Sequence, residues 1–257
     1  MRSHLFLLRE LVKRDFQGRY AGSLFGFVWS LVQPLWLLLL FTFVFSTVMK
    51  VSPVGDVRTK YFAVFLFGGL LPWMALQEGV LRSSTAITDN ASLVKKLRFP
   101  SEILVLAVIL AALLHEAIAA GIYLLVLAFV GELSWGGLPL LLIAVPLQVG
   151  LTLGLGLLAS SLHVFFRDTA QILALLLNAW FYLTPVVYPL ALVPEGYRRW
   201  LELNPLTPLV GLYRQAFLGG SPTLVPGTGG LAVVIAVLLS LGFWLFRRLK
   251  RAFADEI

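Results

Sequence analysis

One pair of ionisable residues, His115 and Glu116, lies in the middle of an otherwise uncharged stretch of the chain. A zinc protease needs the pattern H-E-x-x-H, but position 119 is alanine, so that chemistry is excluded. Two interpretations stay open, namely a proton relay of a secondary transporter and a structural polar contact with a neighbouring helix. The other apolar stretches carry no Asp, Glu, Lys or Arg at mid-length to continue a relay, so the structural contact is favoured.

A glycine-rich segment at 150–156 invites comparison with a phosphate-binding loop. It reads GLTLGLG, and no lysine follows it, so it lacks the G-x-x-x-x-G-K-[ST] pattern that cradles nucleotide phosphates. Any ATP used by this protein must therefore be bound by a partner chain. The chain has no cysteine, which excludes disulfides and thiolate metal sites, and we expect no cofactor or metal in this chain itself.

The composition is that of a polytopic membrane protein. Of 257 residues, 59% are hydrophobic and only 13% are charged, whereas soluble domains are about 25% charged. The net charge of +7 comes from basic residues that flank the apolar stretches instead of forming one patch. Anionic lipid headgroups are therefore the expected partners of this charge, and nucleic acid is not.

Six apolar stretches, five of them uncharged, predict six transmembrane helices in a single all-α membrane domain over residues 1–257. They are Phe25–Val48, Tyr61–Gln77, Ile103–Val130, Leu138–Leu162, Ile172–Tyr188 and Leu231–Phe246. The second and fifth are short and rich in Pro, Gly or aromatic residues. The third carries His115 and Glu116 at its middle, so the first, fourth and sixth are the clearest.

The distribution of Lys and Arg predicts the orientation. With six crossings, 14 of these residues lie on the side of both termini and 6 on the other side. By the positive-inside rule both termini are cytoplasmic, in a cytoplasmic (inner) membrane.

A charged amphipathic helix precedes the first span without a spacer. Leu5, Leu8, Val12 and Phe16 form one apolar stripe at helical spacing, and such a helix lies along a membrane surface. We expect residues 1–22 to form this interface helix.

Two loops are too long to be simple connections. The cytoplasmic segment 84–101 predicts a short helix that Asp89 or Asn90 caps and Pro100 ends, with cationic residues suited either to a partner groove or to lipid headgroups. The outer segment 189–230 contains an apolar stretch from Leu206 to Leu218 that is too short to cross, which favours a re-entrant or interfacial helix.

Small residues and prolines have a structural interpretation. The G-x-x-x-G pairs Gly150/Gly154 and Gly22/Gly26 let helices approach closely, within or between protomers. Pro34 and Pro185 should kink or end their helices.

Five segments in the same order resemble the membrane subunit of type 2 ATP-binding-cassette exporters, in the branch that exports O-antigen, teichoic acid and other cell-envelope polysaccharides. They are LVKRDFQGRYAGSLFGFVWSLVQP at 11–34, NASLVKKLRFPSEIL at 90–104, FFRDTAQIL at 165–173, TPVVYP at 184–189 and NPLTPLVGLYRQAFLG at 204–219.

The resemblance implies a six-span permease that works as a homodimer, binds two cytoplasmic ATPase subunits, which supply ATP and Mg²⁺ chemistry, and passes a lipid-linked glycan between protomers. It assigns ATPase coupling to Arg14, Asp15, Arg19, Asn90, Leu93, Val94, Lys95, Lys96, Phe99, Pro100, Arg167 and Asp168. It assigns the outer gate, a pair of re-entrant helices between spans five and six, to the region of Pro185, Asn204 and Pro205.

Aromatic residues in or beside the first, second and fifth spans are candidates for a glycan path, because sugar rings pack on aromatic faces. The candidates are Trp29, Phe62, Trp73, Phe181, Tyr182 and Tyr188. For each single residue the ordinary interfacial belt of Trp and Tyr is the favoured alternative.

Two classes of function therefore stand. The first is a non-enzymatic permease of an ATP-driven polysaccharide exporter. The alternative is a proton-coupled carrier that uses His115 and Glu116, or an ATP-driven exporter of a drug or lipid.

Overall fold

The computed structural model describes residues 2–18, 22, 24–50, 59–96, 100–219 and 221–257, and all regular structure within these ranges is helical. The first half contains α1 (Arg2–Gly18), η1 (Gly26–Val28), α2 (Trp29–Phe41), η2 (Thr42–Val48), α3 (Phe62–Thr85), α4 (Ala91–Lys96) and α5 (Glu102–Phe129). The second half contains η3 (Trp135–Leu140), α6 (Leu141–Phe165), α7 (Thr169–Tyr182), η4 (Leu190–Leu192), α8 (Glu195–Glu202), α9 (Leu206–Leu218), α10 (Thr228–Leu249) and α11 (Phe253–Glu256).

Every stretch predicted as a span contains a helix. Four helices in the described ranges are long and apolar enough to cross a membrane: α3, α5, η3 with α6, and α10. The apolar helices Trp29–Phe45 and Thr169–Tyr182 are shorter. The all-helical membrane fold is thus confirmed with four candidate spans, and the count of six stays a prediction.

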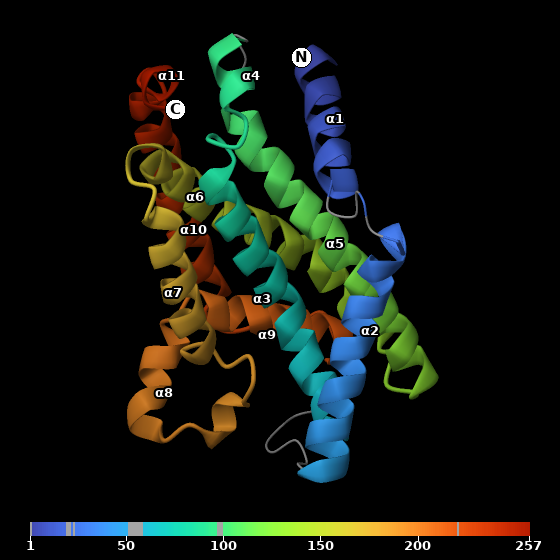
Figure 1. Ribbon diagram of the computed structural model, residues 1–257. Helices are drawn as coiled ribbons and strands as arrows, with labels where there is room; N and C mark the ends of the chain where they lie inside the picture. Colours follow the sequence, from blue (N-terminus) through green and yellow to red (C-terminus); the bar gives the residue numbers. More distant parts are fainter. Residues whose placement is uncertain (1, 19–21, 23, 51–58, 97–99, 220) are drawn as a thin grey trace.

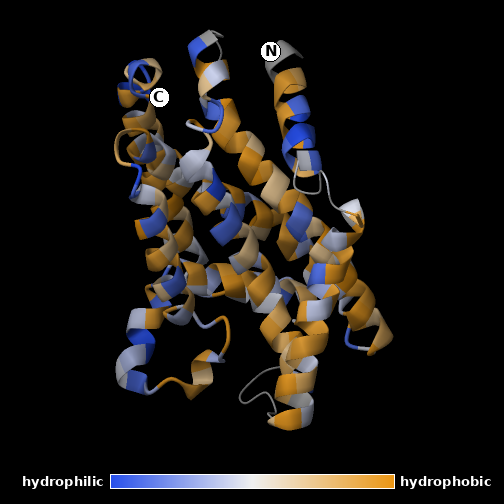
Figure 2. Cartoon of the chain, in the orientation of Figure 1, coloured by the Kyte–Doolittle hydropathy of each residue, from blue (hydrophilic) through white to orange (hydrophobic). Residues whose placement is uncertain are grey.

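The helices form an elongated bundle with two different ends (Figure 1). One end carries α1, α4, the α6–α7 connection and α11, so both labelled termini lie there. We call it the α1–α4 end. The opposite end carries α8, and we call it the α8 end. Hydrophilic residues gather on α1 and α8, whereas α5 between the two ends is largely hydrophobic (Figure 2).

Helix α9 lies across the bundle, beside α3 and α6 (Figure 1). Its bounds, Leu206–Leu218, are those of the predicted re-entrant or interfacial stretch. Eight of its thirteen residues are buried, among them Leu209, Leu212 and Phe217. A helix this buried belongs to the protein core, because it exposes little surface to either water or lipid.

Glycines fix the close packing of α6 on α10. A Cβ atom at Gly154 would lie 2.9 Å from Leu238 Cβ, and one at Gly150 would lie 2.7 Å from Ile235 Cγ2. This pair is therefore a packing notch within the chain, as its spacing predicts. Gly22 and Gly26 differ, because both have positive φ, 79° and 47°, and no atom lies within 4 Å of an added Cβ. Their positive φ suits a turn, and among the described residues neither glycine packs a helix.

Helix α2 continues into the π-helical segment η2. Thr42 Oγ1 donates a hydrogen bond to Leu38 O at 2.8 Å, four residues back. Such back-bonding widens the local helical turn. Pro34 lies inside α2 without ending it, and α7 ends at Tyr182, three residues before Pro185.

Candidate functional site

One apolar cluster holds the α1–α4 end together. Its buried members come from helices far apart in the sequence and include Leu11, Leu104, Phe246 and Phe253. Partly buried side chains of α4, Leu93 and Val94, pack against the same cluster. Helices α1, α4, α5, α10 and α11 are therefore fixed to one another through a shared core.

A hydrogen bond joins two residues that the resemblance assigns to ATPase coupling. Arg14 Nη2 donates to Asn90 Oδ1 at 2.6 Å, and Asn90 Nδ2 donates to Ala86 O at 2.9 Å. Asp89 Oδ2 instead accepts a bond from Thr85 Oγ1 at 2.7 Å. Of the two predicted capping side chains, Asn90 thus ties α1 to the turn before α4, and Asp89 bonds the end of α3. The described bonds of neither side chain go to the α4 amides.

The remaining coupling candidates differ in exposure. Lys95, Arg167 and Asp168 are exposed at the α1–α4 end, and Pro100 is half-buried. A rigid end that presents exposed charges can dock a partner by electrostatic complementarity. Arg19, Phe99 and the side chain of Lys96 lie outside the described residues, so their predicted roles stay predictions.

An ion-pair network that the sequence analysis missed connects α1, α3 and α5. Arg82 donates two hydrogen bonds to the Asp15 carboxylate, at 2.5 and 2.9 Å. Its Nη1 atom also lies 3.5 Å from Glu78 Oε1, and Glu78 Oε2 lies 3.5 Å from His115 Nδ1. The i,i+4 spacing of Glu78 and Arg82 was visible in the sequence, but the pairing with Asp15 spans 67 positions. Asp15 therefore orients α1 on α3.

Glu116 belongs to a separate polar network in the bundle core. Gln148 Nε2 donates to Glu116 Oε2 at 2.9 Å, and the Tyr213 hydroxyl donates to Gln148 Oε1. These contacts connect α5, α6 and α9. They favour the structural interpretation of Glu116, because buried polar side chains need hydrogen-bond partners in the core.

Asn204 is the centre of the candidate gate region. Its Nδ2 donates to Leu183 O and Thr184 Oγ1, both at 2.9 Å. Its Oδ1 accepts from Trp180 Nε1 at 2.9 Å and from Leu206 N at 3.0 Å, in the first turn of α9. One amide side chain therefore fastens the end of α7 to the beginning of α9, where Pro205 is the N-cap residue.

Arg214 of α9 is a second fastening that sequence reasoning missed. Its guanidinium donates to the carbonyl oxygens of Pro185 at 2.7 Å, Val186 at 2.5 Å and Phe65 at 3.3 Å. It also lies 3.7 Å from the centre of the Phe65 ring. A Cβ atom at Gly69 would lie 2.6 Å from Arg214 Nη2, so glycine is what admits the guanidinium. The sequence signal for this contact was a single arginine, Arg214, inside an apolar stretch of 13 residues.

Four of the aromatic candidates lie in one group between α3 and the end of α7. The Trp73 and Phe181 rings are 5.3 Å apart, and the Phe181 and Tyr182 rings are 5.1 Å apart. The Tyr188 hydroxyl donates to Tyr182 O at 2.9 Å. Trp73 is 3% exposed and Tyr182 is 69% exposed. Tyr182 is therefore the member of this group best placed to meet a ligand.

The other two aromatic candidates lie apart from that group. Phe62 is 6% exposed and packs against Phe45, with ring centres 4.9 Å apart. Trp29 is 39% exposed and packs against Phe25, with ring centres 5.9 Å apart. Phe62 is buried in the single chain, and the role of Trp29, Phe62 and Tyr182 in a glycan path stays a prediction.

Comparison with known proteins identifies the family of this chain. The family described as ABC-2 type transporter matches residues 7–218. The O-antigen export system permease protein RfbA of Myxococcus xanthus is 31% identical over 98% of this chain and 95% of its own length. RfbA of Klebsiella pneumoniae is 30% identical over 97% and 94%, and the polysialic acid transport protein KpsM of Escherichia coli is 26% identical over 95% and 94%. The chain belongs to the ABC-2 type transporter family.

Proposed function

We propose that this protein is the membrane permease of an ATP-driven exporter that moves a lipid-linked cell-envelope polysaccharide, such as an O-antigen, across the cytoplasmic membrane. The observation that carries the proposal is the similarity to O-antigen export permeases over nearly the whole length of both chains. The fold supports it, because it gathers the segments assigned to coupling at one end of the bundle and the gate segments at or near the other.

The proposed assembly contains two copies of this chain and two ATPase subunits. ATP and Mg²⁺ act in the ATPase subunits, so this chain is a transport component and not an enzyme. The ATPase would meet the exposed side chains of Lys95, Arg167 and Asp168. The Arg14–Asn90 hydrogen bond and the apolar cluster at the α1–α4 end would transmit its movement to the spans. The exposed apolar side chains of α2 and α7, such as Trp36 and Leu175, would face lipid or the second copy.

The first experiment tests the partner. The tagged permease is purified in mild detergent from its native membrane, and co-purifying proteins and lipid-linked glycan are identified together. We expect a cytoplasmic ATPase and a glycan carrying a lipid. Lys95→Glu should reduce the recovered ATPase, because it reverses a charge on the proposed docking surface, whereas Arg199→Glu at the α8 end should not. A permease that purifies alone and exports glycan without nucleotide would contradict the proposal.

The second experiment tests the orientation. The sequence has no cysteine, so a single introduced cysteine is the only thiol. With Lys95→Cys, a membrane-impermeant maleimide should label the protein only after the cells are opened. Glu202→Cys in α8 should be labelled in intact cells whose outer barrier has been removed. The reverse pattern would place the α1–α4 end outside and exclude ATPase docking there.

A third experiment separates the proton-coupled alternative. Glu116→Gln removes the ionisable group while keeping the size of the side chain and a hydrogen-bonding oxygen. The exporter proposal expects nearly unchanged, ATP-dependent export. Loss of export together with transport driven by a pH gradient would favour the carrier instead. Identification of the co-purified cargo separates a glycan from a drug or a simple lipid.

A further inference from the structure

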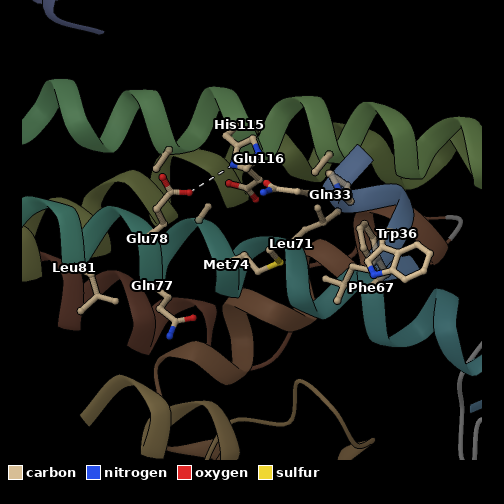
Figure 3. Close-up of a pocket in the computed structure, with 15 residues that line it drawn as sticks. Gln33, Trp36, Phe67, Leu71, Met74, Gln77, Glu78, Leu81, His115 and Glu116 are labelled. Atoms are coloured by element: carbon tan, nitrogen blue, oxygen red, sulfur yellow. Dashed lines mark ion pairs between the residues drawn. The ribbon is translucent and has the colours of Figure 1, made fainter. Parts of the chain in front are cut away.

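A cavity of about 470 Å³ lies between α2, α3 and α5. Its size falls in the range of small-ligand sites, about 300–1,000 Å³. Figure 3 shows its wall from α3 and α5, with Glu78 facing His115 across the two helices. Among the residues that line this cavity, only His115 and Glu116 have a functional role in the sequence analysis, in the proton-coupled alternative.

The cavity changes in polarity along α3. Phe67, Leu71 and Met74 line one part, and Glu78 lines the part nearer the α1–α4 end. On α5, Ala112 and Ala119 flank the polar His115 and Glu116 at the same cavity. An apolar pocket with a few convergent polar groups at one end suits a molecule with an apolar chain and a polar head.

A second, more open cavity of about 610 Å³ continues the first toward the α1–α4 end. The two share Gln33, Glu78 and His115 as lining residues, so they are adjacent. The second cavity is also lined by Arg14, Asp15, Gly18 and Arg82. It therefore forms a polar mouth to the apolar cavity.

The mouth contains charged groups of both signs. Two guanidinium groups, of Arg14 and Arg82, lie with two carboxylates, of Asp15 and Glu78. Each guanidinium has five N–H donors. The exposed Arg14 uses Nη2 for Asn90, so other donors of this group can reach a phosphate. The carboxylates can accept hydrogen bonds from a primary ammonium group.

The depth of the cavity matches one leaflet of a bilayer. The apolar part of the cavity on α3 runs from Phe67 to Glu78, which are 11 positions apart, or about 16.5 Å along the helix. One leaflet contributes about 15 Å of a hydrocarbon core of about 30 Å. The polar mouth lies beside amphipathic α1, a helix type that lies at the headgroup level of a membrane.

We propose that this cavity binds one phospholipid of the cytoplasmic leaflet, with an acyl chain along Phe67, Leu71 and Met74 and a phosphoethanolamine headgroup in the mouth. The phosphate lies toward Arg14 and Arg82, and the ammonium group lies toward Glu78 and Asp15. A choline headgroup has no N–H donor for these carboxylates, and a glycerol headgroup leaves a net negative lipid beside them. Phosphatidylethanolamine is therefore preferred over phosphatidylcholine and phosphatidylglycerol. This proposal does not depend on the exported cargo.

Native mass spectrometry of the delipidated full-length protein, after addition of each of the three lipids at equal concentration, tests the preference. We expect one phosphatidylethanolamine per chain to survive detergent removal, with about tenfold lower occupancy by the other two lipids. Glu78→Gln should remove most of this preference, whereas Glu102→Gln, which lies outside both cavities, should keep it. Equal retention of all three lipids would overturn the headgroup assignment.

Two methionines provide a matched test of the chain site. Met74 lines the cavity and is 44% exposed, whereas Met49 lies outside it and is 58% exposed. Met74→Trp should fill the cavity and lower lipid retention about tenfold, and Met49→Trp should leave it unchanged. Equal retention by both variants would overturn the proposal.

Photocrosslinking keeps the proposal testable if Met74→Trp does not fold. The unmodified protein is incubated with phosphatidylethanolamine that carries a photoreactive group at the end of one acyl chain. Crosslinked peptides should come from the 67–75 region of α3. Crosslinks confined to the outer face of α10, around Val237 and Leu241, would show only surrounding lipid and would overturn the site.

Discussion

The α1–α4 end and the α9 gate region hold their helices by different kinds of contact. At the α1–α4 end, side chain meets side chain: Arg82 pairs with Asp15, and Lys250 Nζ pairs with Glu102 Oε2 at 2.8 Å. At α9, side chains bond mainly to backbone: Arg214 donates to three carbonyl oxygens, and Asn204 bonds Leu183 O and Leu206 N.

This difference sets how easily each region can rearrange. Partly exposed ion pairs contribute about 0–1 kcal/mol each and can exchange partners or water. Buried backbone carbonyls that lose a charged donor leave unsatisfied groups in the core, which costs about 1–3 kcal/mol each. The polar contacts at the α1–α4 end can thus rearrange while its apolar core stays packed. Helix α9, in contrast, moves only together with the residues that follow α7.

The largest expected effect is at Arg214. Arg214→Met keeps most of the apolar stem but leaves the carbonyls of Pro185, Val186 and Phe65 without their donor. The free energy of unfolding should fall by about 2–6 kcal/mol, or about 1–3 kcal/mol for each of the buried carbonyls of Pro185 and Val186, measured by denaturant titration in detergent micelles. Arg199→Met, an exposed arginine of α8, should change it by less than about 0.5 kcal/mol. Equal effects of the two variants would remove the distinction between the regions.

Asn204 should give the next largest effect. Asn204→Ala removes the link between α7 and α9 and should lower the free energy of unfolding by about 1–3 kcal/mol. Asn204→Asp keeps the oxygen that accepts from Trp180 and Leu206 but loses both donors, so its loss should be smaller. Hydrogen exchange at the first amides of α9 should accelerate more in Asn204→Ala than in Asn204→Asp. If Asp and Ala behave alike, the capping oxygen contributes nothing.

The Asp15–Arg82 pair should give a smaller effect. A double-mutant cycle with Asp15→Asn and Arg82→Gln should yield a coupling energy of about 1 kcal/mol or less. The side chains are 18% and 34% exposed, so solvent weakens the attraction. A coupling energy above about 3 kcal/mol would show that this end is as firmly fastened as α9.

Salt should have the smallest effect and should act on one region only. At about 1 M salt the Debye length falls to about 3 Å, which weakens exposed ion pairs. Hydrogen exchange at the beginning of α5 and the end of α10, near Glu102 and Lys250, should accelerate severalfold. Exchange in α9 should not change. Lys250→Gln should abolish the effect of salt on exchange at the beginning of α5 and the end of α10. If the effect persists in this variant, another ion pair causes it.

The sequence predicts the helices well because each depends on a local property. The length of each apolar stretch predicted all six apolar helices. A stretch that is apolar but too short to cross predicted α9 with its correct bounds. The spacing of Gly150 and Gly154 predicted a helix contact, although only the structure names α10 as the partner. Whether all six helices cross the membrane depends on their position in the bilayer, and neither the sequence pattern nor the packing within one chain specifies that position.

The sequence predicts the site less completely because its contacts join distant segments. Arg82 meets Asp15 across 67 positions, and Arg214 meets Phe65 across 149. No local pattern selects such partners, since they depend on how whole helices pack. The same applies to Glu116, for which the sequence favours a structural contact over a relay but does not identify its partners, Gln148 and Tyr213.

The position of Phe253 in the apolar cluster at the α1–α4 end has a consequence for biosynthesis. Phe253 packs against Phe246 and Phe165, and the cluster that it completes also contains Leu11 of α1. Because chains emerge from the ribosome N-terminus first, this core stays open until the region around Phe253 has been translated. Nascent or truncated chains would then lack the finished α1–α4 end and, if the proposed ATPase docks there, would not compete with complete permeases for it.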